Sequence, residues 1–225
     1  MSLKRLFAVI AISSAFAQPA LATVIVGAQT VLTTFGPIPG YTVNSPGLIN
    51  QEGLVPVSPA SPKYVSGVTP YFDFLVGPPP KTHSAINSST GFKGSGHQGQ
   101  FDFTLTEAYA LAHIAIWNGD GNSGINEFDV WVSADSTFAS PSLVGTFNAL
   151  AQSPPHGQNF DFDMTTQGAF VRMIVKSGHS GLNSIALGEV AFGALVKTVS
   201  EPASAALLGL GLLGFGFRRR SGHQR

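Results

Sequence analysis

The sequence predicts an all-β fold: a single β-sandwich or jelly roll, flanked by an N-terminal signal helix and a C-terminal apolar sorting helix. Apolar and polar residues alternate in several segments of the second half of the chain, and period two is typical of half-buried strands. Clusters of Gly, Asn, Ser and Pro separate these segments, as turns separate short strands. No segment carries a helical stripe of period 3.6 over a helical length.

The first 22 residues have the order of a secretory signal peptide. Two basic residues precede an apolar stretch of eleven residues, 6–16. Ala20 and Ala22 then place small side chains where signal peptidase reads the chain. Eleven apolar residues are too few to span a bilayer, because a spanning helix needs about 20. We therefore expect cleavage after Ala22, with an alternative site at 15–17.

The proline-rich first half of the domain is predicted to hold few strands. Residues 24–34 are expected to form the opening strand. Ten of the 15 prolines fall between Pro37 and Pro80, and proline cannot donate a ladder hydrogen bond. We therefore expect long surface loops with short edge pieces over 36–70, and a further strand over 71–76.

The second half carries the clearest strand signals. Alternating apolar and polar residues predict strands at 101–106, 128–133, 160–163 and 171–176. Segment 110–117 is apolar nearly throughout, so we expect a central strand that is covered on both faces. Residues 185–192 are expected to form the last strand.

Composition limits the function classes. Removing both predicted signals leaves residues 23–197, a comfortable size for one domain. This segment holds six basic and eleven acidic residues, a net charge of −5, which argues against nucleic acid as a partner because phosphates require clustered Lys and Arg. The sequence has no cysteine, which excludes disulfides, thiol nucleophiles and thiolate metal sites.

The C-terminal segment, 198–225, has three parts in a fixed order. It opens with the motif Ser200, Glu201 and Pro202. An apolar run over 203–217 follows, and as a helix it reaches only ~22 Å, short of the ~30 Å hydrocarbon core. The run is closed by three arginines, Arg218, Arg219 and Arg220. This charge predicts that the run stops in the membrane with its end in the cytoplasm.

These three parts resemble the PEP-CTERM sorting domain of Gram-negative, exopolysaccharide-producing bacteria. Members are thought to be cut near the motif by an exosortase, a membrane transpeptidase, and passed outward. Ser200 stands where the family has its first proline, while Glu201 and Pro202 match. The resemblance implies an exosortase partner, transient inner-membrane anchoring, and a final place at the cell surface or in the extracellular matrix. The alternative is an ordinary retained tail anchor.

The strands expected within 100–195 also resemble those of discoidin-type domains. The matching segments, in family order, are 100–105, 125–135, 170–175 and 187–192. Such domains are galactose-binding-like jelly rolls that bind glycans, lipids or proteins through loops at one end. The resemblance therefore implies this fold, whereas the early Asp-Gly and Trp of the family pattern are not clear in this chain.

One loop has the composition of a cation site. Residues 118–124 alternate oxygen-bearing side chains with glycine, and Asn118, Asp120 and Asn122 are the candidate ligands. Calcium takes six to eight oxygen ligands in a flexible turn. The loop departs from an EF-hand at its sixth and twelfth positions, and a polar hairpin turn is the simpler account. No cofactor other than calcium is indicated.

Three further residues are candidate ligand contacts: Trp131, His97 and His179. Trp131 lies in the polar-side register of its strand, where its ring can stack on a sugar, although a second covered face explains that position equally well. The two histidines lie in Gly-rich loops without metal-ligand spacing. Residues 94–99 match G-x-G-x-x-G, but a strand follows them, so we do not expect a dinucleotide site.

No catalytic arrangement is recognisable in the sequence. Residues 178–181 resemble a nucleophile elbow, but Leu182 replaces its last glycine. The sequence therefore favours a non-enzymatic exported module that binds extracellular polysaccharide or surface partners. One alternative is a structural matrix protein without a ligand site. Another is a glycan-active hydrolase, which would need two carboxylates within about 5–10 Å.

Overall fold

The computed structural model describes residues 21–34, 42–44, 46–55, 63–76, 82–83, 92–95, 99–119, 124–151, 156–179 and 184–197. Ala22–Val196 form one compact unit. The other unit, Met1–Leu21 with Lys197–Arg225, lies outside the described residues apart from Leu21 and Lys197, so the expected signal helix and sorting helix are not described. No helix in the described part of the chain is long and apolar enough to cross a membrane.

The described residues form eleven strands, one 3₁₀ helix and one α-helix. In chain order they are β1 (Leu21–Val26), β2 (Thr30–Thr34), β3 (Thr42–Asn44), η1 (Pro46–Leu48), β4 (Leu54–Val55), α1 (Tyr71–Val76), β5 (Thr82–His83), β6 (Phe92–Ser95), β7 (Gly99–Asn118), β8 (Glu127–Ser133), β9 (Ser142–Asn148), β10 (Gly157–Val175) and β11 (Ser184–Lys197). The predicted all-β class is confirmed.

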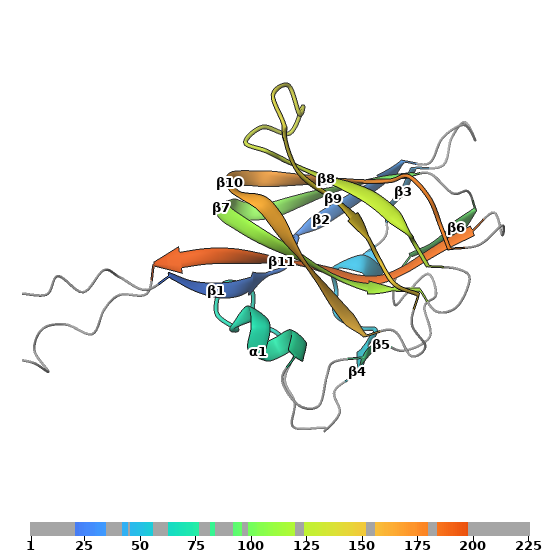
Figure 1. The fold of residues 1–225 in the computed structure, drawn as a ribbon, viewed down its shortest axis with the longest axis horizontal. Helices are drawn as coiled ribbons and strands as arrows, with labels where there is room; N and C mark the ends of the chain where they lie inside the picture. Colours follow the sequence, from blue (N-terminus) through green and yellow to red (C-terminus); the bar gives the residue numbers. More distant parts are fainter. Residues whose placement is uncertain are drawn as a thin grey trace, which may run out of the picture. The chain divides into compact units, whose positions relative to one another are not determined.

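Nine strands belong to one sheet. Six of them follow one another in the order β1-β11-β7-β10-β8-β9, and β2, β3 and β6 pair off this path. β2 pairs with β7 and β3, and β6 pairs with β11, while β4 and β5 form a separate small sheet. Every strand pair with a described register is antiparallel. Figure 1 shows how these strands enclose the interior.

The long strands β7 and β10 join two layers of the sandwich. The first part of β7 pairs with β2, and its second part pairs with β11. The register between β10 and β7 shifts between Asp161 and Thr166 and again between Gly168 and Phe170. The β8 layer therefore holds β3, β2, the first part of β7, the second part of β10, β8 and β9. The α1 layer holds β1, β11 with its partner β6, and the remaining parts of β7 and β10. This is the expected sandwich.

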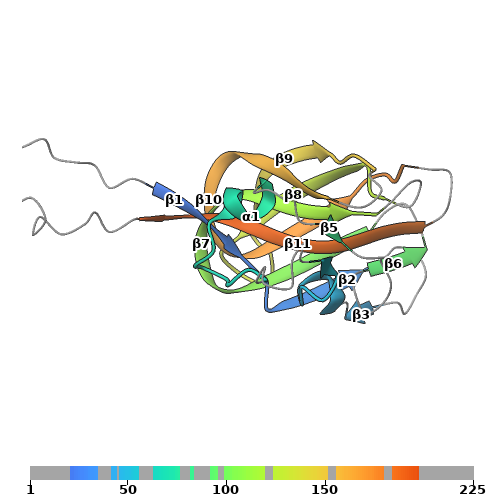
Figure 2. The ribbon, with the colours of Figure 1, turned by 90° about the horizontal axis from the view of Figure 1, so that it is seen from below.

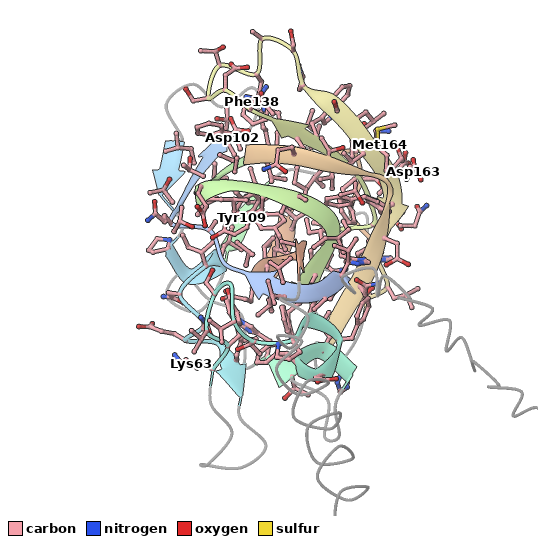
Figure 3. All side chains as sticks on the ribbon, turned by 90° about the vertical axis from the view of Figure 1, so that its left-hand side faces the viewer. Lys63, Asp102, Tyr109, Phe138, Asp163 and Met164 are labelled. Carbon is pink, nitrogen blue, oxygen red and sulfur yellow. The ribbon has the colours of Figure 1, made fainter. Side chains whose placement is uncertain are left out.

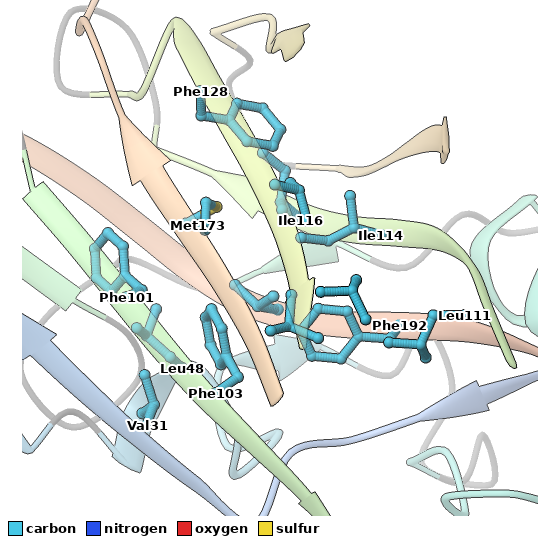
Figure 4. Close-up of a cluster of buried hydrophobic side chains, with 14 of the residues drawn as sticks. Val31, Leu48, Phe101, Phe103, Leu111, Ile114, Ile116, Phe128, Met173 and Phe192 are labelled. Atoms are coloured by element: carbon cyan, nitrogen blue, oxygen red, sulfur yellow. The ribbon is translucent and has the colours of Figure 1, made fainter. Parts of the chain in front are cut away.

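The main core lies between the two layers. The predicted alternation is confirmed, because its apolar positions are buried on three strands: Phe101, Phe103 and Leu105; Phe128, Val130 and Val132; Val171, Met173 and Val175. Figure 4 shows ten labelled members of this core. Phe192 of β11 meets Phe103 edge to face, with ring centroids 5.5 Å apart, so the core connects both layers.

A second apolar cluster covers the outer face of the α1 layer. Residues 51–55 and 63–76, here called the cover segment, contribute Leu54, Tyr64, Tyr71, Phe74 and Leu75. These side chains pack on Ala115 and Trp117 of β7, whereas Ile114 and Ile116 face the main core. In Figure 1 α1 lies below β1 and β11, and in Figure 2 it lies in front of the sheet. The expectation that 110–117 is covered on both faces is confirmed.

Two expectations for the first half were wrong, and a third was right only in part. Residues 71–76 form α1 rather than a strand, because the spacing of Tyr71, Phe74 and Leu75 places all three on one helical face over the sheet. The opening strand is two strands, β1 and β2. The 36–70 region does hold short edge pieces, but Leu54 and Tyr64 are buried, so it is not only surface loop.

Candidate functional site

Asn118 closes the turn at the end of β7. Its side chain is buried, and its Oδ1 accepts the N–H groups of Gly119 at 3.0 Å and Ile125 at 2.8 Å. Its Nδ2 donates to the carbonyls of Ile125 and Leu150. The amide therefore holds the turn, with both oxygen lone pairs occupied by backbone donors. Asp120 and Asn122 lie outside the described residues.

His179 belongs to the same loop end. Its Nε2 lies 2.6 Å from the carbonyl oxygen of Ala149, and because a carbonyl only accepts, Nε2 carries the proton. Its backbone N–H donates to Gly124. The structure thus brings Asn118 and His179 to one loop cluster. His97 lies outside the described residues, and no three His, Asp or Glu side chains within them gather as a metal-ligand group.

Trp131 lies on the outer face of the β8 layer, as its register predicted. A cross-strand row runs through Leu32, Asp102, Arg172, Trp131 and Leu143. Both leucines at the ends of this row are exposed. The indole of Trp131 is half-buried, and its Nε1 has no hydrogen-bond partner among the residues that the structure describes. We call this row, with Phe138, the Trp131 surface.

Arg172 is held rigidly on the Trp131 surface. Its Nε and Nη2 donate to Asp102 at 2.7 and 2.9 Å, and its guanidinium lies 4.0 Å from the ring centroid of Phe138. The hydrogen bonds with Asp102 raise the pKa of Arg172. Phe138 has a left-handed backbone, φ 53°, in a turn that Asp135 stabilises by accepting the N–H of Thr137. Figure 3 shows Asp102 and Phe138 together on this side.

A polar cluster that the sequence did not reveal lies at the edge of α1. The Nδ1 of His113 on β7 is 2.8 Å from Oδ1 of Asp161 on β10, its cross-strand neighbour. Asn159 donates from Nδ2 to the same oxygen at 2.6 Å. Tyr71 of α1 donates to Oδ1 of Asn159 at 2.8 Å. We call these four residues, together with Phe72, the His113 cluster.

Two aromatic rings of α1 frame His113. Tyr71 stacks on the imidazole with centroids 5.2 Å apart and ring planes at 21°. Phe72 meets it edge to face at 5.1 Å and is 43% exposed. Gly193 of β11 makes this stacking feasible, because a Cβ there would lie 2.8 Å from His113 Cδ2 and 3.1 Å from Tyr71 Cδ2.

The electrostatics of the cluster favour a charged carboxylate. Hydrogen bonds from Asn159, then from His113, lower the pKa of Asp161. Because that carboxylate only accepts, the His113 Nδ1 donates to it. Burial, then the charge of Asp161, raises the pKa of Tyr71 well above its usual value. Tyr71 therefore stays a hydrogen-bond donor, and the network has one defined direction.

The His113 cluster has the chemical parts of a sugar site. A carboxylate oxygen and an imidazole can hydrogen-bond to hydroxyls, and an exposed ring offers an apolar surface for a sugar's C–H face. The sequence contained only a weak signal for it: Asn159 and Asp161 alternate with Phe160 and Phe162. What it lacked was the pairing of β7 with β10 and the helical state of 71–76.

A buried carboxyl, Glu189, lies beneath the cover segment. Glu189 of β11 is buried; its Oε2 accepts the N–H of Gln51 at 3.0 Å, and its Oε1 accepts the hydroxyl of Tyr64 at 3.1 Å. Gln51 has a left-handed backbone, φ 60°. Burial raises the pKa of Glu189 well above its usual value, although these hydrogen bonds and the charge of Lys63 oppose the shift. The carboxyl thus ties the cover segment to the sheet.

The sequence matches one family model. Residues 198–220 match the PEP-CTERM protein-sorting motif, so the resemblance drawn from Glu201, Pro202 and the arginines is confirmed. Ser200, Ala20 and the rest of both ends lie outside the described residues, while Ala22 lies in β1. Among curated proteins no sequence matches the chain.

The structural neighbours are family 32 carbohydrate-binding modules (CBM32) and F5/8 type C, or discoidin-type, domains. They include the CBM32 of AlyQ in complex with 4,5-unsaturated mannuronic acid (21% identity, 47% of this chain, 78% of that chain, TM-score 0.38). A Clostridium perfringens CBM32 in complex with GalNAc-β-1,3-galactose is 15% identical (42% and 65%, TM-score 0.36). An F5/8 type C domain from Bacteroides fragilis is 9% identical (49% and 78%, TM-score 0.40). The chain spans just under two thirds of the C. perfringens module.

Proposed function

We propose that the chain is an exported, non-enzymatic surface or matrix protein whose β-sandwich binds extracellular polysaccharide. The sorting motif at 198–220 implies export and surface association in a Gram-negative bacterium. The observation that carries the binding function is the His113 cluster, where the exposed ring of Phe72 meets the imidazole of His113, and that imidazole is hydrogen-bonded to the exposed carboxylate of Asp161.

The proposed route to the surface has two processing steps. Signal peptidase cleaves after Ala22, and residues 203–217 then hold the chain transiently in the inner membrane. An exosortase cuts near Glu201 and Pro202 and passes the domain, residues 23–197, outward. Ser200 in place of proline is expected to affect the efficiency or the specificity of this cut.

In the proposed complex the sugar lies on Phe72 beside Asp161. Aromatic contact stabilises the apolar face of a sugar ring, and the carboxylate accepts its hydroxyl protons. The partners of Asp161 and His113 are already in place, so little side-chain entropy is lost on binding. Trp131, His97 and His179 remain predicted secondary contacts. Calcium at 118–124 remains a prediction alongside the simpler hairpin turn, and the Oδ1 of Asn118 already accepts two backbone N–H groups.

The test is a glycan-array screen of the full chain, expressed with export in a Gram-negative host and purified in detergent, with calcium and with chelator. Phe72→Ala should weaken binding about tenfold, the equivalent of ~1.4 kcal/mol. Val68→Ala is the control, because Val68 is an exposed apolar side chain, at 68%, that belongs to neither the His113 cluster nor the Trp131 surface. Binding lost on chelation would support calcium, and binding lost in Trp131→Ala would support the Trp131 surface.

Three results would contradict the proposal. Failure of the wild-type chain to bind any glycan in either condition would favour a structural matrix role. Glycan binding that Phe72→Ala leaves unchanged would move the site away from α1. Turnover of a bound glycan would contradict the non-enzymatic assignment.

A further inference from the structure

Asp161 presents one carboxylate oxygen outward in a fixed orientation. Both of its described hydrogen bonds, from His113 and Asn159, end on Oδ1, and no described residue bonds Oδ2. The side chain is 72% exposed, although Oδ1 is held by His113 on the neighbouring strand β7 and by Asn159 on its own strand β10. Oδ2 is therefore an oriented acceptor that a ligand can reach.

The negative charge of Asp161 is matched by few cations. Among the described side chains, Arg172 pairs with Asp102, and Lys176 pairs with Asp129 and Glu127, all on the β8 layer. Lys63 acts on Glu189. His113 is the one described basic group in contact with Asp161. The neighbours of the site in the chain, Asp73 and Asp163, are acidic and exposed.

The rings beside this carboxylate suit a cation as well. Phe72 exposes its ring next to the stacked pair of Tyr71 and His113, and a cation near an aromatic face gains attraction from the ring quadrupole. A ligand that combines an apolar ring face with an ammonium group would use both parts of the site. A ligand carboxylate would instead be repelled by Asp161.

We infer that the His113 cluster binds an amino sugar with a free ammonium group and excludes uronate sugars. The ammonium donates to Oδ2 of Asp161 while the sugar ring lies against Phe72. An N-acetyl group in its place retains the ring contact but loses the charge-assisted hydrogen bond. This inference rests on the proposed glycan-binding function, and it adds the charge class of the ligand.

The experiment compares three probes on the full chain in detergent: chitosan oligosaccharides, the same oligosaccharides fully N-acetylated, and alginate oligosaccharides. The inference expects the free amine to bind about tenfold tighter than the acetylated form, from one exposed ion pair and one cation–ring contact. Alginate should not bind. Isothermal titration calorimetry at constant ionic strength gives the affinities.

Two variants separate a specific ammonium contact from general attraction to an acidic domain. Asp161→Asn should remove the preference, so that chitosan affinity falls about tenfold toward that of the acetylated probe. Asp163→Asn changes the net charge equally, on the same strand, and should keep the preference. Thermal unfolding of both variants checks that the fold is intact.

The outcomes are distinct. Equal binding of free and acetylated probes, with loss in Phe72→Ala, would overturn the ammonium inference and leave the glycan function standing. Tight alginate binding would do the same. Equal loss in Asp161→Asn and Asp163→Asn would show nonspecific polycation attraction and overturn the inference. No binding of any probe, on the array or by calorimetry, would overturn the proposed function itself.

Discussion

The outer faces of the two layers have the same alternating strands beneath them but different surroundings. On the β8 layer the polar row through Asp102, Arg172 and Trp131 is half-buried and is not covered by another described segment. On the α1 layer the outward residues Trp117 and Glu189 are buried, because the cover segment lies over them. Figure 3 shows Asp102 and Phe138 on one side of the core and α1 on the other.

The two faces differ in how their neighbouring side chains are brought together. On the open face, neighbours come from the strands of one sheet, so pairs such as Asp102 and Arg172 are in register. At the edge of the covered face, α1 brings Tyr71 and Phe72 to His113, about forty positions later in the chain. The rim of a covered face therefore combines rings and polar groups that no single sheet register would bring together.

The two tryptophans should give the largest contrast. Trp117 is fully buried under the cover segment, so Trp117→Ala should lower the free energy of unfolding by about 3–5 kcal/mol. Trp131 is half-buried on the open face, so Trp131→Ala should cost roughly 1–2 kcal/mol. Urea unfolding of both variants measures this. Equal losses would mean that the Trp131 surface is covered as well.

The strand pattern was predictable because alternation reports directly on burial. Phe101 and Phe103, or Val171 and Met173, are buried as their spacing indicates. The helical state of α1 was not predictable from the sequence, because Tyr71 to Val76 are aromatic and apolar enough to suit a strand. Only their packing on Trp117 and Ala115 selects the helical face. Six residues are too few to show a helical periodicity in the sequence, so tertiary packing determined the secondary structure of this segment.

The candidate site was less predictable than the fold. Trp131 was placed on an outer face by its register alone, and the structure has it there. His113 carried no signal in a strand that is otherwise apolar, and its partner Asp161 lies 48 residues away. Their meeting depends on the antiparallel register of β7 and β10. Asn118, the last residue of β7, shows a different limit. The oxygen-rich composition of 118–124 does not reveal that the Asn118 side chain already accepts the N–H groups of Gly119 and Ile125.

A buried acid distinguishes the covered face by its response to pH. Burial raises the pKa of Glu189 in the folded chain, so above the ordinary Glu pKa the folded state binds more protons than the unfolded state. Stability from this group is present at low pH and is lost as pH rises toward the folded pKa. Chemical denaturation from pH 4 upward should therefore show a decline that Glu189→Gln lacks.

Glu189→Gln is a suitable mimic of the protonated acid. Its amide oxygen can accept the N–H of Gln51, while its NH₂ donates to the hydroxyl of Tyr64. The control is Glu52→Gln, an exposed carboxyl on the same cover segment, which should keep the wild-type decline. A wild-type and Glu189→Gln difference that does not vary with pH would contradict this account.

Two left-handed residues, one over each layer, should respond differently to glycine. Gln51→Gly relieves roughly 1 kcal/mol of backbone strain against a similar entropic cost and keeps the N–H to Glu189. It loses the hydrogen bond from Gln51 Nε2 to the carbonyl of Tyr64, so it should cost about 1 kcal/mol. Phe138→Gly gains the same relief but loses a buried ring over Arg172, and should cost about 2 kcal/mol. Thermal and urea unfolding test both, and a stabilised Phe138→Gly would show that the ring contributes nothing to the Trp131 surface.

The smallest expected difference is between the coupling energies of two ion pairs, Asp102 with Arg172 and Asp161 with His113. Asp102 and Arg172 form a two-point pair in which both side chains are about one quarter exposed, so a double-mutant cycle to alanine should give a coupling of about 1 kcal/mol. In the His113 and Asp161 pair the carboxylate is 72% exposed, and the coupling should be about 0.3 kcal/mol. If the second coupling is the larger one, then Asp161 contributes mainly to stability, and its exposure is not evidence of a ligand site. If it is small, Asp161 is held in place by its partners without being needed by the fold, as expected of a residue that meets a ligand.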